Sequence, residues 1–270
     1  MRLYAFLLFF LTTKILCAQS SENINAYKTD SGYFTSFDKI KIYYEVRGEG
    51  YPVMLIHGFI VTGASWKNTE LLNALMREGY KVIIPDLRGN GHSDKPRNTA
   101  AYASDAEAKD IMGLASFLHL NKYNAVGYSR GSIITARLLV LDKRVNKAVL
   151  GGMGTGFTDP NWPRRIQFYE ALSGRPVREL QGMVDNVKKQ GLDTMVLANL
   201  QKEQPYTLPS ALAQVKQKVL IICGDKDSDN GSAQDLKNMF SNASLAIVPG
   251  DHNNASKTME FADVVRAFFK

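Results

Sequence analysis

Continuous apolar runs alternate with helical segments along most of this chain, and this alternation limits the fold more than any other feature of the sequence. Pro52–Ile56 is such a run, with the sequence PVMLI. Uninterrupted apolar runs are typical of strands that are buried on both faces of a parallel sheet. The sequence therefore predicts an α/β fold whose mostly parallel sheet has helices on both faces. Helices separate the further expected strands, at Lys81–Ile84, Tyr123–Val126, Val145–Leu150, Lys218–Cys223 and Leu245–Val248.

Two segments depart from this alternation. Tyr33–Ser36 and Ile40–Val46 alternate in polarity and are expected to form an antiparallel hairpin with a turn near Asp38. Residues 158–210 are too long for an ordinary connection between a strand and a helix. We therefore expect residues 158–210 to form a small helical cap inserted into the sheet domain. Its helical stretches are expected near Trp162–Leu172, Val177–Lys189 and Thr194–Gln201.

Residues 1–18 have the pattern of a secretory signal peptide. A short basic start precedes the apolar run Leu3–Leu11, and the small residue Ala18 ends the segment. The run is shorter than the roughly 20 residues that span a bilayer. We predict cleavage after Ala18, which leaves residues 19–270 as one α/β domain and makes the protein secreted or periplasmic. An uncleaved anchor and a lipoprotein attached through Cys17 are the alternatives.

The composition limits the partners of this chain. The 270 residues carry a formal net charge of +7, and 45% of them are hydrophobic, which suits a globular domain. No long block of lysine and arginine stands out, so a basic surface is favoured over nucleic-acid binding. The sequence holds no metal-ligand cluster, P-loop or dinucleotide fingerprint, since Gly89-Asn90-Gly91 is too short for one. We expect no cofactor, no metal and, after signal cleavage, no stable membrane insertion.

The pentapeptide at residues 127–131, GYSRG, directly follows the expected strand Tyr123–Val126 and opens a helix. Glycines flank Ser129 because a sharp turn from strand to helix leaves no room for side chains there. Such a turn strains the serine and lifts its hydroxyl above the sheet. The amides at the N-terminus of the following helix are then available to a developing oxyanion. Ser129 is therefore the candidate nucleophile.

A serine hydroxyl is a poor nucleophile at neutral pH and needs a general base. The chain has four histidines, at positions 57, 92, 119 and 252. Only His252 follows the last expected strand, so its loop should emerge at the same edge of the sheet as Ser129. The sequence therefore predicts His252 as the base.

An acid that orients this base is expected between the nucleophile and the base in the chain, at the end of a strand. Residues 219–227, VLIICGDKD, supply it, and Asp225, Asp227 and Asp229 compete for the role. We choose Asp227, because a residue further into the loop can turn back toward His252. The acid would fix the imidazole tautomer and stabilise the imidazolium.

Two backbone amides are expected to form an oxyanion hole. One is the N–H of Arg130, the residue after the nucleophile. The other should come from the loop after Pro52–Ile56, where the N–H of Phe59 is the best candidate. His57 in the same loop is expected to anchor the loop rather than to take part in catalysis.

Together these motifs resemble the α/β-hydrolase superfamily. Residues 53–59, VMLIHGF, are similar to its oxyanion loop, and residues 86–93, DLRGNGHS, to its D-x-R-G-x-G-x-S loop, which is mainly structural there. The Gly-x-x-Asp spacing that ends at Asp227 matches the family's acid position and so favours Asp227 over Asp225. The resemblance runs from about Tyr33 to the C-terminus, apart from the cap. It implies an eight-stranded, mostly parallel sheet with the cap over the active site.

The chain departs from the family pattern at two positions. Ser132 stands where the family often has a second glycine, and Asp251 stands where it often has a glycine before the histidine. Neither change removes a catalytic group. The serine nucleophile sets this chain apart from the superfamily's epoxide hydrolases and haloalkane dehalogenases, which use aspartate.

The resemblance and the candidate triad imply a serine hydrolase that cleaves a small-molecule carboxylic ester or related acyl substrate through an acyl-enzyme intermediate. Lactone, amide and carbon–carbon bond hydrolysis, and cofactor-free perhydrolysis, stay open on the same triad because the fold does not choose among them. A ligand-binding protein that keeps the triad and turns over slowly is the alternative of a different class.

Overall fold

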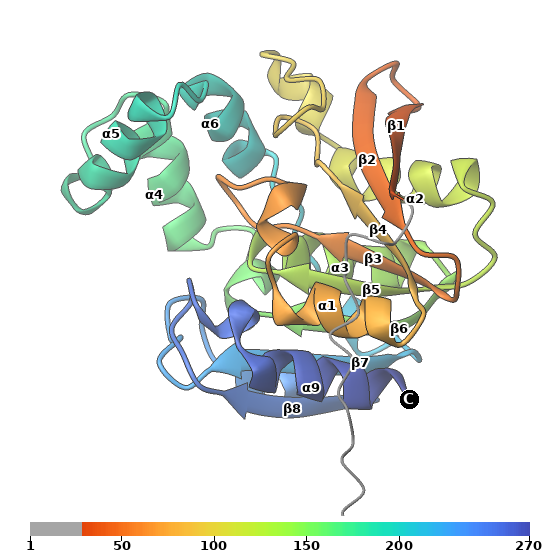
Figure 1. The fold of residues 1–270 in the computed structure, drawn as a ribbon. Coiled ribbons are helices and arrows are strands. Elements are labelled where there is room, and N and C mark those ends of the chain that lie inside the picture. Colours follow the sequence, from red (N-terminus) through yellow and green to blue (C-terminus); the bar gives the residue numbers. More distant parts are fainter. Residues whose placement is uncertain (1–28) are drawn as a thin grey trace, which may run out of the picture.

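The computed structural model describes residues 29–270, so the predicted signal peptide and its cleavage site lie outside the described residues. Eight strands form one sheet in the order β1-β2-β4-β3-β5-β6-β7-β8. β1 and β4 pair antiparallel with β2, whereas the other neighbours are parallel (Figure 1). The predicted mostly parallel, eight-stranded sheet is thus confirmed. The strands are β1 (Thr29–Thr35), β2 (Lys41–Arg47), β3 (Pro52–Ile56), β4 (Lys81–Pro85), β5 (Tyr123–Tyr128), β6 (Val145–Gly151), β7 (Lys218–Gly224) and β8 (Ala243–Val248).

Helices cover both faces of this sheet (Figure 1). α1 and α9 pack together on one face, and α2, α3 and α8 lie on the other. Within residues 29–270, no helix is both long and apolar enough to cross a membrane. The helices are α1 (Glu70–Arg77), α2 (Ala106–Phe117), α3 (Arg130–Leu141), α4 (Pro163–Leu172), α5 (Gln181–Lys189), α6 (Thr194–Lys202), α7 (Pro209–Leu212), α8 (Ala233–Asn238) and α9 (Met259–Phe269).

The central strand β3 shows why its sequence is apolar throughout. Val53 and Leu55 pack in the core beneath α1 and α9, and Met54 and Ile56 pack in the core beneath α2 and α3. All four side chains are fully buried. Successive side chains of a strand point to opposite faces of the sheet, so a strand covered on both faces must be apolar at every position.

The edge strand β1 begins at Thr29, earlier than the predicted start at Tyr33. Its first residues pair with the end of β2, in a register that places Thr29 opposite Arg47 and Gly32 opposite Tyr44. These first residues are polar and exposed. Backbone pairing at a sheet edge needs no apolar side chain, so the hydrophobic pattern gave no signal for this extension.

Residues 158–210 contain α4, α5 and α6, which lie together at one end of the sheet, apart from its helical layers (Figure 1). The Asp193 carboxylate accepts the amides of Met195 and Val196 and so caps the N-terminus of α6. Val196 and Leu200 of α6 belong to a separate apolar cluster that includes Tyr102, which precedes α2. The segment is therefore fastened to the sheet domain through α6.

Candidate active site

The turn between β5 and α3 holds Ser129 in a strained backbone conformation, with φ 54° and ψ −121°. A Cβ on Gly127 would lie 2.2 Å from the carbonyl oxygen of Gly131, and a Cβ on Gly131 would lie 2.0 Å from that of Ile56. Both positions therefore require glycine. The Ser129 amide donates to the Gly151 carbonyl at the end of β6 (2.8 Å), which fixes the turn against the neighbouring strand.

Ser132, the departure from the family's second glycine, strengthens this turn. Its side chain is fully buried. The hydroxyl lies 2.9 Å from the Gly127 carbonyl oxygen and 2.7 Å from that of Gly151. The serine therefore links the start of α3 to the ends of β5 and β6.

The structure brings the three predicted side chains into one hydrogen-bonded chain. The Ser129 hydroxyl lies 2.9 Å from His252 Nε2, and His252 Nδ1 lies 2.9 Å from Asp227 Oδ2. The Asp227 side chain is almost fully buried, at 2% exposure, whereas His252 is 23% exposed. A buried carboxylate at Nδ1 favours the tautomer that leaves Nε2 free to accept the serine proton. This arrangement can deprotonate Ser129 as it attacks an electrophilic carbon.

The other two aspartates of the acid loop lie elsewhere. Asp225 is exposed, and its Oδ1 accepts the Gly250 amide (2.9 Å) in the loop that carries His252. Asp229 reaches toward Arg164 of the cap. A Cβ on Gly224 would lie 2.0 Å from the Gly250 carbonyl oxygen, so the glycine of the Gly-x-x-Asp spacing allows the acid loop and the histidine loop to meet.

The two predicted oxyanion donors lie at the same cavity as Ser129. Phe59 and Arg130 both line that cavity with Ser129 and His252. A Cβ on Gly58 would lie 3.4 Å from Ser129 Cβ, so the loop that carries the Phe59 amide runs directly beside the nucleophile. Arg130 is the first residue of α3, where backbone amides lack intrahelical acceptors and the helix dipole favours negative charge.

His57 holds the loop after β3 from within the core. Its Nε2 accepts the Leu87 amide (3.0 Å), and its Nδ1 lies 2.8 Å from the Gly58 carbonyl oxygen. Burial lowers the pKa of His57, so the ring is neutral and donates from Nδ1. The residue therefore ties the loop after β3 to the loop after β4, and both of its ring nitrogens are engaged in these contacts.

The loop at residues 86–93 is built around buried charges. Arg88 is fully buried and donates to Asp110 through Nε (2.6 Å) and to Asp38 through Nη1 (2.8 Å). Asp86 accepts the amides of Gly63 and His92, both at 2.8 Å. The loop thus connects the hairpin, α2 and the segment after β3, which is a structural role.

Ser129 and His252 lie between two cavities. The one on the cap side has a volume of about 220 Å³ and is bounded by Trp162 and Phe168 of the cap. The other has a volume of about 410 Å³ and is bounded by Trp66 and Lys257 of the sheet domain. An acyl group and a leaving group on either side of one scissile bond could therefore occupy separate spaces.

A sequence model described as alpha/beta hydrolase fold matches residues 51–184. Together with the sheet order and the turn at Ser129, this match decides the family. The chain belongs to the α/β-hydrolase fold superfamily.

Relatives of this α/β hydrolase carry several activity names. A putative non-heme chloroperoxidase of Synechocystis is 42% identical over 113 residues, which are 41% of this chain and 40% of that protein. A non-heme haloperoxidase of Rhodococcus erythropolis is 27% identical over 81% of this chain and 91% of its own. The solved esterase of Exiguobacterium antarcticum has a TM-score of 0.71 at 21% identity, over 87% of this chain and 98% of its own. The chain thus spans less than half the length of the first relative, and the esterase likeness shows the fold alone.

Two neighbours of the histidine in this α/β hydrolase were not predicted from the sequence. Asn230 Nδ2 lies 3.4 Å from His252 Nδ1 and donates to the Gly152 carbonyl (3.1 Å). The Tyr128 hydroxyl donates to the His252 carbonyl (2.9 Å) and its ring packs against the imidazole. Tyr128 occupies a variable position of the elbow pentapeptide, and no sequence signal marked either side chain.

The side chain of Arg130 was also not anticipated, because the predicted role of this residue used only its amide. The guanidinium is 3% exposed and forms a two-point ion pair with Glu107 of α2, which is 2% exposed. It also donates to the Leu200 carbonyl of α6 (2.8 Å) and to Gln204 Oε1 (3.3 Å). The residue that supplies a candidate oxyanion amide therefore also connects the sheet domain to the cap.

Proposed function

We propose that this protein is a serine hydrolase that cleaves a carboxylic ester through an acyl-enzyme intermediate. The observation that carries the proposal is the hydrogen-bonded chain from Ser129 through His252 to the buried carboxylate of Asp227, with 2.9 Å at each step. The two cavities that meet at Ser129 supply room for the acyl and alcohol parts of an ester.

The reaction would proceed in two halves. In the first, Ser129 Oγ attacks the ester carbon while His252 Nε2 takes the hydroxyl proton, and the Phe59 and Arg130 amides donate to the oxyanion. Collapse of the tetrahedral adduct breaks the bond to the alcohol oxygen, which receives the proton from His252. In the second half, a water gives its proton to His252 and attacks the acyl carbon. The acid leaves, and the proton returns to Ser129 Oγ.

The names of the two curated relatives support a second outcome for the same acyl-enzyme. Both are named as non-heme peroxidases of halides. If hydrogen peroxide replaced water in the second half, the acid would leave as a peroxyacid, which can oxidise a halide ion. Adding peroxide and bromide to an ester assay, with a halogen-accepting dye, distinguishes this perhydrolysis from simple hydrolysis.

A fluorophosphonate probe tests the proposed nucleophile. The purified protein should be labelled, and Ser129→Ala should abolish labelling. Ser256→Ala is a matched control, because Ser256 lines the larger of the two cavities beside Ser129 but is not in the hydrogen-bonded chain. Labelling that survives in Ser129→Ala would refute the assignment.

A panel of esters, lactones, amides and vinylogous diketones then tests the substrate class. Steady turnover of esters with a first-order dependence on enzyme supports the proposal. Turnover restricted to another member of the panel would replace ester hydrolysis with that reaction. A single burst of product followed by near-arrest with every substrate would instead support a slow-turnover ligand-binding protein.

A further inference from the structure

The cavity on the cap side of Ser129 has an unusual charge distribution. Three arginines line it, Arg130, Arg164 and Arg165, and among the described residues that line it there is no aspartate or glutamate. A site for a neutral ester needs no guanidinium groups. The three arginines differ in how far neighbouring groups already compensate their charge.

The positive charge of Arg130 is already compensated by Glu107. Glu107 accepts from both its Nε and its Nη2, and both side chains are almost fully buried. The remaining donors face Leu200 and Gln204. This guanidinium is a neutralised, structural part of the cavity wall.

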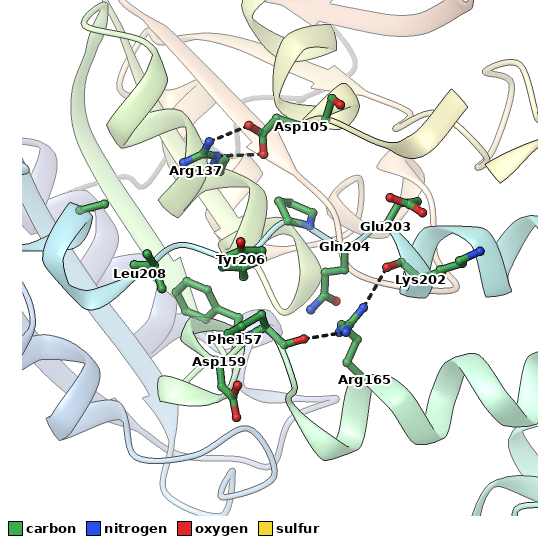
Figure 2. Close-up of a pocket in the computed structure, with 14 residues that line it drawn as sticks. Asp105, Arg137, Phe157, Asp159, Arg165, Lys202, Glu203, Gln204, Tyr206 and Leu208 are labelled. Carbon is green, nitrogen blue, oxygen red and sulfur yellow. Dashed lines mark hydrogen bonds and ion pairs between the residues drawn. The ribbon is translucent and has the colours of Figure 1, made fainter. Parts of the chain in front are cut away.

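Arg165 has no carboxylate partner among the ion pairs of the described chain. It donates to three backbone carbonyls, those of Gln201 (3.0 Å), Lys202 (2.9 Å) and Pro160 (2.7 Å). Figure 2 shows its guanidinium beside Lys202, with a dashed line to the carbonyl of that residue. Carbonyl dipoles at the end of α6 hold the group in place without cancelling its full charge. Burial lowers the pKa of Arg165, although the nearby carboxylates of Glu203 and Asp159 act in the opposite direction; an anion beside the group would further offset the cost of burial.

Arg164 is only weakly compensated. Its Nη2 lies 3.4 Å from Asp229 Oδ2, and both side chains are substantially exposed, at 39% and 56%. Exposed ion pairs of this length contribute little, so the guanidinium can exchange Asp229 for a ligand at small cost. The group also lies 5.2 Å from the ring centre of Phe168, which holds it at the cavity.

The pocket on the far side of Arg165 has the opposite character. This pocket has a volume of about 510 Å³ and shares Arg165 and Gln204 with the Ser129 cavity (Figure 2). Three carboxylates line it, those of Asp105, Asp159 and Glu203. Its basic side chains are therefore balanced by acids, as on an ordinary solvated surface. The Ser129 cavity differs in that none of the described residues that line it is a carboxylate, although it shares Arg165 with this pocket.

We propose that the substrate carries a carboxylate, held in the cap-side cavity by Arg164 and Arg165 while Ser129 attacks its ester carbonyl. This inference rests on the proposed hydrolysis and names its substrate class: half-esters of dicarboxylic acids and related acidic acyl compounds. The cavity of about 220 Å³ is smaller than the pockets of drug-sized ligands, at roughly 300–1,000 Å³. The carboxylate therefore belongs to a short acyl chain.

Two esters with the same five-carbon acyl chain test this proposal. The para-nitrophenyl half-ester of glutaric acid carries a terminal carboxylate, and para-nitrophenyl valerate does not. We expect kcat/KM to favour the glutarate half-ester by about tenfold or more, because a charge-assisted contact of this kind is worth at least one decade in binding. Added sodium chloride should lower the preference, since screening weakens the attraction.

Substitutions assign the preference to the two arginines. Arg164→Gln should lower the glutarate-to-valerate ratio by about tenfold, and Arg164→Lys should restore part of it. Arg165→Gln should act in the same direction, and Arg165→Lys keeps a charged donor for the carbonyls if the glutamine variant does not fold. Arg178→Gln, an exposed cap arginine that lines neither pocket, should leave the ratio unchanged.

Fluorophosphonate labelling separates failure of the acidic-substrate proposal from failure of the proposed hydrolase. Intact labelling and turnover with equal kcat/KM for the two esters would overturn the acidic substrate and leave the serine hydrolase standing. An unchanged ratio in both Arg164→Gln and Arg165→Gln would overturn the assignment to these residues. Absence of labelling, with neither ester cleaved, would refute the hydrolase itself.

Discussion

Replacing Asp227 by asparagine keeps the size of the side chain that faces His252 and removes its charge. The carboxylate lies 2.9 Å from Nδ1 and accepts a hydrogen bond from the ring N–H there. An amide nitrogen at this place would donate to Nδ1 and force the ring proton onto Nε2, the atom that must accept the proton of Ser129. Asn230 Nδ2, 3.4 Å from the same nitrogen, adds a second donor in favour of the wrong tautomer.

The magnitude follows from this tautomer shift. The equivalent aspartate-to-asparagine change in a serine protease costs about 10⁴ in kcat. At 1.36 kcal/mol for each tenfold change, that loss corresponds to about 5.4 kcal/mol of transition-state stabilisation. We expect a decrease of that order in kcat for Asp227→Asn.

The matched control is Asp225→Asn, two residues earlier in the same loop. Asp225 is exposed, and its Oδ1 accepts only the Gly250 amide, a contact that an asparagine oxygen can also make. Loss of charge in such a contact should raise the activation free energy by about 0.5 kcal/mol, which lowers kcat roughly two- to threefold. Both variants should be assayed with the best ester of the panel and normalised by titration of active sites. A larger loss in Asp225→Asn than in Asp227→Asn would refute the reasoning, as would an Asp227→Asn enzyme within tenfold of the parent.

Three further predictions concern stability and processing. Glu107→Gln should destabilise the fold by about 3 to 5 kcal/mol in urea titrations, because it leaves the buried Arg130 charge unpaired; a loss below about 1 kcal/mol would contradict this. For Asp142, burial would raise the pKa, but hydrogen bonds led by Arg144 outweigh it and hold the pKa below 3.8. The contribution of the Asp142 carboxylate to folding stability is therefore complete above that pH and is lost as the pH falls further. Asp142→Asn should be less stable than the parent at pH 7 and should lose less stability on acidification. Urea midpoints measured across this pH range test the prediction. We also propose export, and N-terminal sequencing of natively expressed protein should begin at Gln19; an intact Met1 on cytosolic protein would exclude it.

The sheet and the turn at Ser129 could be predicted because their causes are local. An apolar run such as Pro52–Ile56 reports burial on both faces, and the glycines at 127 and 131 report a turn without room for a Cβ. Both patterns lie within a few consecutive residues. The polar start of β1 left no such pattern, since its pairing with β2 depends on the backbone alone.

The finer features of the site could not be predicted because they depend on contacts between distant segments. The sequence favours Asp227 among three aspartates within five residues, but it does not predict the close packing of the loop at Gly224 against Gly250, beside which Asp227 faces His252. The pairing of Arg130 with Glu107 joins residues 23 positions apart on different helices. Arg164 and Arg165 are adjacent on α4 and read as a solvated face, yet both line the cavity at Ser129.

The double attachment of Arg130 limits how freely this scaffold can exchange its parts. Its amide belongs to the turn that presents Ser129, while its guanidinium is shared between Glu107 of α2 and the Leu200 carbonyl of α6. A cap grafted from another member of the superfamily would have to supply an acceptor where the Leu200 carbonyl lies. Without one, the Arg130 guanidinium would lose a hydrogen bond beside the cavity that holds Ser129. Modular replacement of residues 158–210 is therefore constrained at its inner end, and the first position to match in designing such a chimera is the end of α6.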